Sequence, residues 1–387
     1  MKKIIFLIDT ISVGGAELSV LEVAKNLKTF EVLVCVVYDA QQGLKTQFEE
    51  AGIRLVFFQI KKRFGFRKAV LKFKQLLKEE DPALVHATNF KSEIISRLGL
   101  FKFNIPLVGS IISDTYGIDR YKLVSPRERL KLNLYKLLNR ATAGRVDKFI
   151  SVSEAIVFPN MKYLKQPRDK FIVIPNGRNT SLFARDKSSN RNTVFPQIPS
   201  PSMIIISTSR VIKSKGFDEM IEAFQKLLLI EENVFFVVAG DGFDLEYYKQ
   251  ESTKAGIGHR VLFLGRRDDI PRLLQNSDIF WFPSHYEGSP GVVIEAMLAK
   301  IPIIASDIVP ILENLKDGYN ALICKKGDSD SLLEKTEYLL AHYHEAEEMA
   351  GKAHALALEK FDIRKLIIEQ ENFYLSLISQ YDSEKGA

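Results

Sequence analysis

The sequence predicts an α/β protein with two domains, each built on a doubly wound parallel β-sheet, that face a central cleft. Three observations support this prediction. The chain has 387 residues, which is long for one hydrophobic core, and 46% of them are hydrophobic, which is enough for two cores. Short apolar runs alternate with amphipathic stretches, as strands and helices do in parallel sheets. The alternation breaks once, in a polar segment with three prolines, and then starts again.

The first predicted domain covers residues 1–180. Its apolar runs have the length of buried strands, and amphipathic stretches at residues 17–27, 66–77 and 127–138 have helical spacing. The predicted strands are residues 4–8, 32–38, 55–59, 84–86, 107–110, 149–152 and 171–174. The first run follows two lysines but stops at Asp9 without a cleavage site, which favours a strand over a signal peptide.

Residues 181–202 are the predicted linker, and residues 203–362 form the second predicted domain. Its predicted strands are residues 204–207, 234–239, 261–264, 279–282 and 303–305. Residues 363–387 are predicted to form a C-terminal helix that packs back on the first domain. Ligands of such Rossmann-like sheets bind at the carboxyl ends of the strands, so the two domains are expected to share one cleft.

Composition limits the class of function. The formal charge of +6 and the pI near 9.0 favour an anionic partner, such as a phosphorylated ligand or an acidic membrane surface. No repeat of basic and aromatic residues indicates a nucleic acid. The two cysteines, Cys35 and Cys324, are too few for a disulfide scaffold or a cysteine zinc site. The low cysteine count fits a reducing compartment, so a cytoplasmic protein is expected, and no apolar stretch has the length of a membrane span.

Two glycines, Gly14 and Gly15, stand between the first predicted strand and a predicted helix. Glycines let the backbone approach a ligand closely, and a helix start favours an anion or a sugar oxygen. The dinucleotide fingerprint with three spaced glycines is absent. A binding loop and an ordinary tight turn are therefore both consistent with this motif.

Two basic residues flank the first loop of the second predicted domain. Arg210 follows a predicted strand, and Lys215 precedes a predicted helix. Two cations at the carboxyl end of a strand suit a diphosphate. The alternative interpretation is a solvated basic loop.

The most informative segment is residues 282–297. A predicted strand ends, a loop carries Glu287 and Gly288, and Pro290 is typical of the first turn of a helix. Backbone amides at this helix start are expected to face an anion, namely those of Gly291, Val292 and Val293. Glu295 lies about one turn further on among apolar residues, so its carboxylate is expected to have a specific partner.

At this point the chain resembles the retaining glycosyltransferases of family four, which have the two-Rossmann (GT-B type) fold. The resemblance runs through most of the chain. Glu287 and Glu295 match the Glu-x7-Glu motif of the family, and Arg210 and Lys215 match its phosphate-binding pair. The other motifs in family order are Gly14-Gly15-Ala16-Glu17, Val152-Ser153-Glu154, Ile174-Pro175-Asn176-Gly177, Ala239-Gly240-Asp241-Gly242 and Phe263-Leu264-Gly265-Arg266-Arg267.

The resemblance implies a nucleotide diphosphate sugar as donor, expected to be UDP-linked, and neither a metal nor another cofactor. Arg210 and Lys215 would hold the diphosphate and stabilise the leaving nucleotide, which is electrostatic work. With Glu287, which would contact sugar hydroxyls, they form the expected catalytic set. The remaining donor contacts that the resemblance implies are Gly14, Gly15, Gly265, Arg267, Gly288, Gly291, Val292 and, for the ribose, Glu295.

The acceptor is expected to bind the first domain. Many family members carry a histidine after the fifth strand of this domain, but here Ile112 stands at that position. Asp114 and His86 are the candidate acceptor-side residues, although a structural role for His86 at its strand end is equally consistent. Isoleucine neither donates a hydrogen bond nor carries a proton, so Ile112 keeps open a non-catalytic, donor-binding partner subunit.

Two further motifs have alternative interpretations. Asp328 and Asp330 resemble an Asp-x-Asp metal motif, but their place before a predicted helix favours capping. A basic stretch with aromatic residues, from Lys61 to Lys74, indicates peripheral contact with an anionic membrane, against the alternative of a solvated helix face.

The expected function is therefore transfer of a hexose from a nucleotide sugar, with retention of anomeric configuration and without metal, to a glycan or lipid-linked acceptor. This activity would serve the synthesis of bacterial-type surface polysaccharide or lipopolysaccharide. An alternative is a sugar-nucleotide epimerase of the same fold, which would turn over the donor without an acceptor. The other alternative is the non-catalytic partner subunit.

Overall fold

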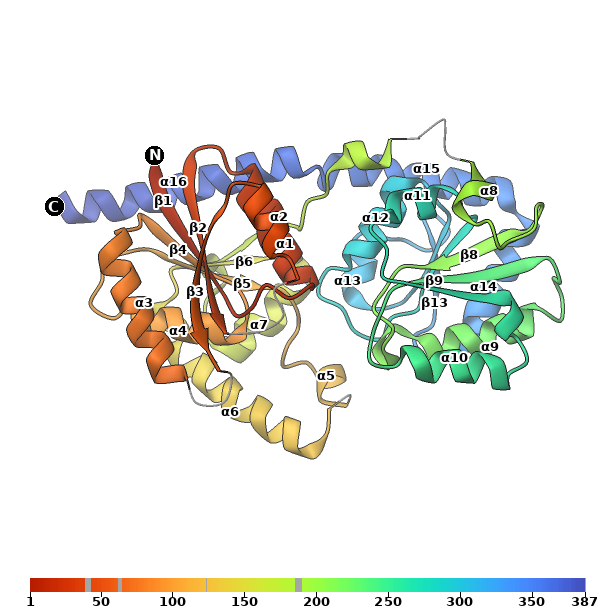
Figure 1. The fold of residues 1–387 in the computed structure, drawn as a ribbon, viewed down its shortest axis with the longest axis horizontal. Coiled ribbons are helices and arrows are strands. Elements are labelled where there is room, and N and C mark those ends of the chain that lie inside the picture. The colour runs from red at the N-terminus through yellow and green to blue at the C-terminus, as the bar shows by residue number, and fades with distance from the viewer. Residues whose placement is uncertain (39–42, 62–64, 123, 185–189, 387) are drawn as a thin grey trace. The chain divides into compact units, whose positions relative to one another are not determined.

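The computed structural model describes residues 1–38, 43–61, 65–122, 124–184 and 190–386. The chain divides into two compact units. Unit 1 comprises Met1–Gly177 and Ile363–Ala387, and unit 2 comprises Arg178–Asp362. Figure 1 shows parallel strands with helices on both sides in each unit, so the α/β fold class predicted from the alternation of apolar runs is confirmed.

The sheet of unit 1 is entirely parallel, with strand order β3-β2-β1-β4-β5-β6-β7. Its strands are β1 (Lys2–Ile8), β2 (Phe30–Tyr38), β3 (Arg54–Ile60), β4 (Leu84–Ala87), β5 (Leu107–Ile111), β6 (Lys148–Ser151) and β7 (Phe171–Val173). The central strand β1 is buried from Ile4 to Ile8, which explains its continuous apolar run.

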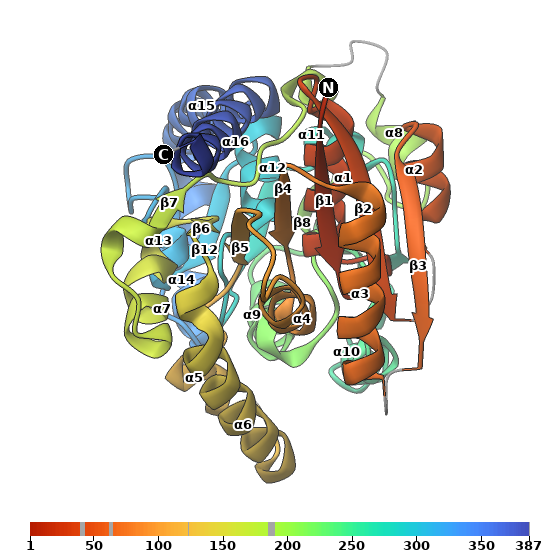
Figure 2. The same cartoon turned by 90° about the vertical axis from the view of Figure 1, so that its left-hand side faces the viewer.

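Helices cover both faces of this sheet. One face packs on α1, α2 and the C-terminal helix α16, and the other packs on α3, α4 and α7. The helices of unit 1 are α1 (Gly15–Asn26), α2 (Lys45–Glu50), α3 (Phe66–Glu80), α4 (Phe90–Gly99), α5 (Ile118–Lys122), α6 (Pro126–Thr142), α7 (Val157–Leu164) and α16 (Ile363–Gly386), with the 3-10 turns η1 (Ala143–Arg145), η2 (Glu154–Ile156) and η3 (Arg168–Lys170). Figure 2 views this unit from its side, with α6 extending beyond the other helices.

The sheet of unit 2 is also parallel, with order β10-β9-β8-β11-β12-β13. Its strands are β8 (Met203–Ser207), β9 (Val234–Ala239), β10 (Val261–Gly265), β11 (Ile279–Phe282), β12 (Ile303–Ser306) and β13 (Leu322–Cys324). Its helices are α8 (Arg191–Val194), α9 (Phe217–Leu227), α10 (Leu245–Lys254), α11 (Ile270–Gln275), α12 (Gly291–Ala299), α13 (Val309–Leu312), α14 (Ser329–Ala341) and α15 (Tyr343–Lys360), with η4 (Thr180–Phe183), η5 (Lys213–Lys215) and η6 (Gly258–Arg260). Within the described part of the chain, no helix is both long and apolar enough to cross a bilayer.

Both sheets reverse their strand order next to their first strand. In unit 1 the chain runs outward from β1 to β3 and then crosses to β4, and in unit 2 it runs from β8 to β10 and then crosses to β11. Such a point leaves a crevice at the carboxyl ends of the two central strands, and ligands of doubly wound sheets bind there. Ligand sites are therefore expected at the loops after β1 and β4 in unit 1 and at those after β8 and β11 in unit 2.

The boundary between the units differs from the predicted linker. The described residues of the segment 181–202 belong to unit 2, and three of their side chains, Phe183, Phe195 and Ile198, lie in its hydrophobic core. Prolines and polar residues suggested a linker, but these three apolar residues anchor the segment to the domain. The C-terminal helix α16 belongs to unit 1 and packs on its sheet.

Candidate functional site

The carboxyl ends of β8 and β11 bring together Lys215 and Glu287. Lys215 ends the turn η5 after β8, and Glu287 lies in the loop after β11. The Lys215 ammonium forms an ion pair with the Glu287 carboxylate, and 13% and 11% of the two side chains are exposed. Ser284 Oγ donates to the same carboxylate at 2.7 Å, and the Phe282 ring centroid lies 5.4 Å from Lys215 Nζ. The pair is thus held in one geometry at the strand ends.

Backbone packing fixes the two loops that carry this pair. Gly216 has a φ of 79°, and a β-carbon at this position would lie 2.2 Å from the carbonyl oxygen of Pro283. The Ser214 carbonyl accepts a hydrogen bond from the His285 amide at 2.9 Å. The His285 ring, in turn, lies 2.9 Å from a carboxylate oxygen of Glu219 on α9. Because backbone meets backbone, the distance between Lys215 and Glu287 does not depend on flexible side chains alone.

The helix α12 begins at Gly291, one residue after the N-cap Pro290. The amides of Gly291 and Val292 stand at the first two helical positions, where helices have no internal acceptor. The Val293 amide donates to the Pro290 carbonyl at 3.0 Å. The prediction that the Val293 amide faces an anion is therefore wrong, because the first turn of the helix already uses it.

Arg178 is a residue of this region that the sequence reasoning missed. Its Nε donates to Glu295 Oε1 at 2.8 Å, so Glu295 has the specific partner expected of a carboxylate in an apolar turn. A β-carbon on Gly291 would lie 1.8 Å from Arg178 Nη2, so the guanidinium rests on the start of α12 and would have to shift if residue 291 had a side chain. The only sequence signal was that Arg178 follows the Ile174-Pro175-Asn176-Gly177 motif.

The other predicted donor residues lie along the same sheet edge or beside it. Arg210 is exposed after β8, and within the described residues no carboxylate forms an ion pair with it. Gly265 ends the edge strand β10 with a φ of 64°, and Arg267 makes two hydrogen bonds to Asp269, at 2.8 and 2.7 Å. Gly288 is buried directly after Glu287. The structure thus groups Lys215, Glu287, Gly288 and the start of α12, while Arg267 lies two strands from β8.

In unit 1, Gly14 is the N-cap of α1 and Gly15 is the first residue of this helix, after β1 at the switch point with β4. A β-carbon on Gly14 would lie 2.4 Å from the Glu17 carboxylate, which folds back over this glycine. Asn89, in the loop after β4, donates to Glu17 at 3.2 Å. Burial raises the pKa of Glu17. A β-carbon on Gly15 would meet open space, whereas one on Gly14 would displace the Glu17 carboxylate.

His86 forms hydrogen bonds to groups on both of its sides. Its Nδ1 lies 2.6 Å from the Tyr374 hydroxyl on α16, and its Nε2 lies 2.8 Å from the Ser110 hydroxyl on β5. Complete burial lowers the pKa of His86 to about 3, so the imidazole is neutral. The residue also lines a pocket with Ala16 of α1 and Ile112. His86 is therefore a structural link to α16 that also borders a pocket.

A second pocket adjoins the first at Ile112 and Ser110, which line both. Its wall includes Ser113 and Tyr116 after β5 and Tyr135 on α6. Asp114 is not among the described lining residues, and a β-carbon on Gly117 would lie 2.1 Å from its carboxylate. The contact of Asp114 with a substrate stays a prediction, and the Asp114 side chain packs within its own turn.

A buried ion pair supports the wall of this second pocket. Arg97 pairs with Glu93 at 2.5 Å and donates to Asn139 Oδ1 on α6 at 2.6 Å. The Ser110 amide donates to Glu93 at 3.1 Å. Burial raises the pKa of Glu93 to about 7, against the opposing charge of Arg97. Burial also raises the pKa of Asp9, although the Ser92 amide donates to it at 2.7 Å.

The Asp-x-Asp motif caps a helix. Asp328 is the N-cap of α14 and accepts a hydrogen bond from the Ser331 amide at 2.9 Å, which lowers the pKa of Asp328. Asp330 pairs with Lys226 at 2.5 Å. Among the residues that the structure describes, no three His, Cys, Asp or Glu side chains form a group that could hold a metal ion.

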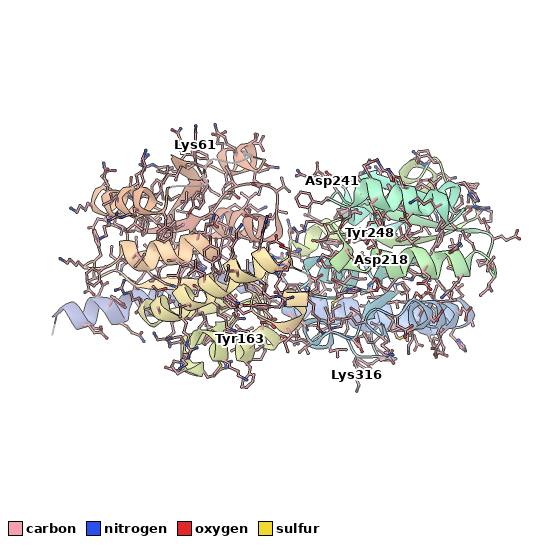
Figure 3. All side chains as sticks on the ribbon, turned by 90° about the horizontal axis from the view of Figure 1, so that it is seen from below. Lys61, Tyr163, Asp218, Asp241, Tyr248 and Lys316 are labelled. Atoms are coloured by element: carbon pink, nitrogen blue, oxygen red, sulfur yellow. The ribbon has the colours of Figure 1, made fainter. Side chains whose placement is uncertain are left out.

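The basic stretch from Lys61 to Lys74 is described only in part, because residues 62–64 lie outside the described residues. Lys72 donates to the Phe58 carbonyl at 2.9 Å, so this ammonium is bound to the protein itself. Figure 3 places Lys61 at the edge of unit 1 opposite to Tyr163 of α7. Contact of this stretch with a membrane stays a prediction.

The two switch points therefore offer different chemistry. Unit 2 offers a cation held by a carboxylate, an exposed arginine and free amides, a set that suits a phosphorylated ligand. Unit 1 offers two adjoining pockets whose linings combine apolar side chains and neutral hydrogen-bonding groups with Glu22, Glu93 and Arg120. A pair of doubly wound domains with an ionic site in one of them is typical of enzymes that bind nucleotides.

Comparison with known proteins identifies the class of enzyme. Residues 13–182 match the family model described as Glycosyltransferase Family 4, and residues 189–355 match the model described as Glycosyl transferases group 1. The chain therefore belongs to the glycosyltransferases of the family-four type with the two-Rossmann, GT-B fold. The resemblance seen in the sequence is thereby confirmed.

The individual relatives have low sequence identity to this chain. The chain is 27% identical over 326 residues to an Escherichia coli UDP-Gal:α-D-GlcNAc-diphosphoundecaprenol α-1,3-galactosyltransferase, covering 80% of this chain and 81% of the relative. It is 21% identical over 326 residues to the capsular polysaccharide biosynthesis glycosyltransferase CapM of Staphylococcus aureus, covering 83% and 84%. The crystal structure of Anabaena HepE in complex with UDP-glucose superposes with a TM-score of 0.82 at 24% identity, covering 96% and 100%. The similarity to this crystal structure shows the fold of the chain.

Proposed function

We propose that this glycosyltransferase moves a hexose from a UDP-linked donor to a lipid-linked glycan, with retention of anomeric configuration and without a metal ion. The observation that carries the proposal is the grouping of Lys215, Glu287 and the start of α12 at the switch point of unit 2. The group lies where ligands of doubly wound sheets bind, and its charges suit a diphosphate.

The donor would be held mainly by unit 2. Lys215 and Arg210 would neutralise the diphosphate, with the free amides of Gly291 and Val292 adding hydrogen bonds. Glu287 would orient Lys215 and accept hydrogen bonds from sugar hydroxyls, while Glu295, held by Arg178, would contact the ribose. Gly265 and Arg267 would border the nucleobase, and Gly14 and Gly15 are the donor contacts that we propose for unit 1. A UDP-linked donor is supported by the names of relatives that use UDP-galactose or bind UDP-glucose.

The acceptor would bind the pockets of unit 1. His86, Ser110 and Ile112 are among the residues that line these pockets, and these three side chains offer hydrogen bonds and apolar surface without a charge. A lipid-linked glycan is supported by the Escherichia coli relative, whose name states a diphosphoundecaprenol acceptor, and by the capsular polysaccharide relative. The protein would then act in polysaccharide or lipopolysaccharide synthesis, at the cytoplasmic face of a membrane.

The leaving group determines the chemistry. When the bond between the sugar and the diphosphate breaks, negative charge develops on the diphosphate, and fixed cations stabilise that charge without a metal. The oxygen of the acceptor hydroxyl bonds to the anomeric carbon on the face from which the diphosphate leaves, which gives retention, and the released phosphate oxygen accepts the hydroxyl proton. This route requires no side chain at position 112 that can carry a proton, so Ile112 is compatible with activity.

The test is a transfer assay with the full-length protein and a panel of UDP-hexoses. The acceptor is N-acetylglucosamine linked through a diphosphate to a short polyprenol, and each reaction runs with and without a chelator. We expect an α-linked product, identified by its anomeric coupling in NMR, at an equal rate in both conditions. Loss of activity that manganese restores would contradict metal independence, and a β-linked product would contradict retention. Donor turnover without an acceptor would favour an epimerase, and binding without turnover would favour a partner subunit.

A further inference from the structure

The helix α6 has one face that packs on unit 1 and one that the unit leaves uncovered. In the packed face, Tyr135 meets Phe90 edge to face at a centroid distance of 4.5 Å, and Asn139 bonds to Arg97 and to the Tyr116 hydroxyl. The Lys136 ammonium lies 4.5 Å from the centroid of the Tyr163 ring. The capping box at Ser125 fixes the start of the helix. The helix is therefore firmly attached along one side.

The opposite face is apolar and exposed. At about 100° per residue, positions 130, 134, 137 and 141 share one side of a helix. Three of these positions hold leucines. The exposed fraction is 73% for Leu130, 58% for Leu134 and 64% for Leu137, and Leu138 beside them is 40% exposed. Figures 1 and 2 both show α6 reaching away from the sheet of unit 1. No described residue of the chain covers this leucine face.

Basic residues flank the leucine face on both sides. Arg127 and Lys131 lie on one side of the stripe, and Arg129 and Arg140 lie on the other, all exposed. Residues 118–142 contain seven basic and two acidic residues, a net charge of +5, compared with +6 for the whole chain. The segment that contains the leucine face is therefore strongly basic.

We propose that the leucine face of α6 lies in the surface of an anionic membrane, with the leucines among the acyl chains and the flanking arginines and lysines at the lipid phosphates. An apolar stripe bordered by basic residues is the pattern of helices that bind in the plane of a bilayer. Each basic residue near an anionic surface adds to the attraction.

The charges argue against a second copy of this chain as the occupant. Two α6 helices packed through their leucine faces would place basic flanks against basic flanks in either orientation. Helix pairs that associate through an apolar stripe usually have opposite charges at those positions. An anionic lipid surface complements both flanks at once.

The position of α6 connects this surface to the pocket. The packed face contributes Leu132, Tyr135 and Asn139 to the pocket that Ile112 also lines. A membrane-bound leucine face would thus hold this pocket next to the lipid surface. This step rests on the proposed function, in which a lipid-linked acceptor enters unit 1.

The experiment is flotation of the full-length protein with vesicles of equal parts phosphatidylcholine and phosphatidylglycerol, and with pure phosphatidylcholine. The test variant combines Leu130→Ser, Leu134→Ser and Leu137→Ser. We expect at least about a tenfold fall in its partition coefficient, or about 1.4 kcal/mol. Arg127→Gln with Lys131→Gln should weaken binding at low salt and have less effect at high salt, where charges are screened.

Matched controls separate this surface from others. Leu71→Ser on α3, where 67% of the leucine is exposed, and Leu229→Ser in unit 2, where 86% is exposed, should float like the wild type. Because the substituted leucines are exposed, the melting temperature should stay the same, which a thermal scan checks. Lys68→Gln with Lys74→Gln tests the basic stretch from Lys61 to Lys74 as the rival surface.

Several outcomes would overturn the proposal. These are unchanged flotation of the leucine variant, loss of binding in the Lys68 and Lys74 variant alone, equal binding of the wild type to neutral vesicles, or a concentration-dependent dimer that the leucine variant abolishes. Flotation needs no donor or acceptor, so a wild type that binds vesicles but transfers no sugar contradicts only the proposed function. A leucine variant that floats like the wild type contradicts only the membrane surface.

Discussion

The two switch points of this chain have the same topology but differ in how their ionisable groups are stabilised. In unit 2 the charged groups form ion pairs near the surface, Lys215 with Glu287 and Arg178 with Glu295. In unit 1 burial disfavours the charged forms of four ionisable groups, although one of them, Glu93, also pairs with Arg97. The pKa values of Asp9, Glu17 and Glu93 are raised and that of His86 is lowered, in each case mainly by desolvation.

This difference indicates how one type of fold supports two kinds of binding. A diphosphate requires fixed positive charge, which unit 2 supplies at its strand ends. A glycan offers neutral hydroxyls, for which neutral hydrogen-bonding groups in a pocket are suitable partners. The following substitutions test whether the charges of unit 2 serve a ligand and whether those of unit 1 serve the fold.

The largest effect on stability should come from Arg97, which forms a buried ion pair with Glu93 within α4 and a hydrogen bond to Asn139 of α6. Arg97→Met should lower the free energy of unfolding by about 3–5 kcal/mol, because it leaves the buried Glu93 without its partner. Arg168→Met is the control, since the ion pair of Arg168 with Glu154 is half exposed. This substitution should lower the free energy of unfolding by about 0–1 kcal/mol. Urea unfolding followed by circular dichroism measures both. Equal effects of the two variants would mean that the buried pair is not a structural element of unit 1.

Lys215 should have the largest effect on activity. Lys215→Ala should lower kcat by about 10²–10³-fold, because it removes a fixed charge that stabilises the leaving diphosphate. Lys213→Ala is a matched control two residues away, where the lysine is exposed and pairs with Asp218. Steady-state transfer rates with saturating donor give the comparison. Near-normal activity of Lys215→Ala would remove this residue from the catalytic set.

His86 should make unit 1 sensitive to acid. Its pKa in the folded state is about 3, below the ordinary value of 6.5, so the unfolded state binds a proton more readily in that window. The neutral His86 imidazole therefore contributes fully to the free energy of unfolding above the ordinary pKa of 6.5. As the pH falls from 6.5 toward 3, this contribution is lost by about 1.4 kcal/mol per pH unit.

The His86→Gln variant isolates this contribution. The buried carboxyls with raised pKa values act in the opposite direction, but they are present in both proteins and cancel in the difference. Urea unfolding at neutral and mildly acidic pH should show a steeper loss of stability for the wild type than for His86→Gln. Parallel pH dependence of the two proteins would contradict the buried, neutral state of this imidazole.

The smallest effect should come from Ile112. It lines both pockets of unit 1 but offers neither charge nor hydrogen bond. Ile112→Ala should leave kcat within about twofold of the wild type, well below the tenfold change that 1.4 kcal/mol represents. A large loss in kcat with unchanged KM would assign this side chain a role in the transferring step.

The sequence predicted the sheets better than the details of the site. Apolar runs such as residues 4–8 coincide with strands because parallel strands are buried on both faces. The predicted linker was harder to place, because Phe195 and Ile198 anchor a segment whose prolines suggested an irregular connection. Local composition does not reveal which core an isolated apolar side chain joins.

The sequence also did not show which residues become neighbours only in the folded structure. Glu287 and Glu295 were recognised from their spacing, but their ion pairs with Lys215 and Arg178 join residues 72 and 117 positions apart in the chain. The only local signal for Arg178 is its place after the motif at residues 174–177, and only the fold brings it to the start of α12. The leucine face of α6 was also missed, because an apolar helical stripe in a sequence usually indicates a buried face.

The most direct test of the central claim is calorimetric titration of the wild type and Lys215→Ala with UDP and with uridine. If unit 2 holds the donor through its diphosphate, the wild type should bind UDP at least about a hundredfold more tightly than uridine, or about 2.7 kcal/mol. In Lys215→Ala most of that difference should disappear, while uridine binding stays the same. Equal affinity of the wild type for UDP and uridine, or an unchanged difference in the variant, would contradict the claim.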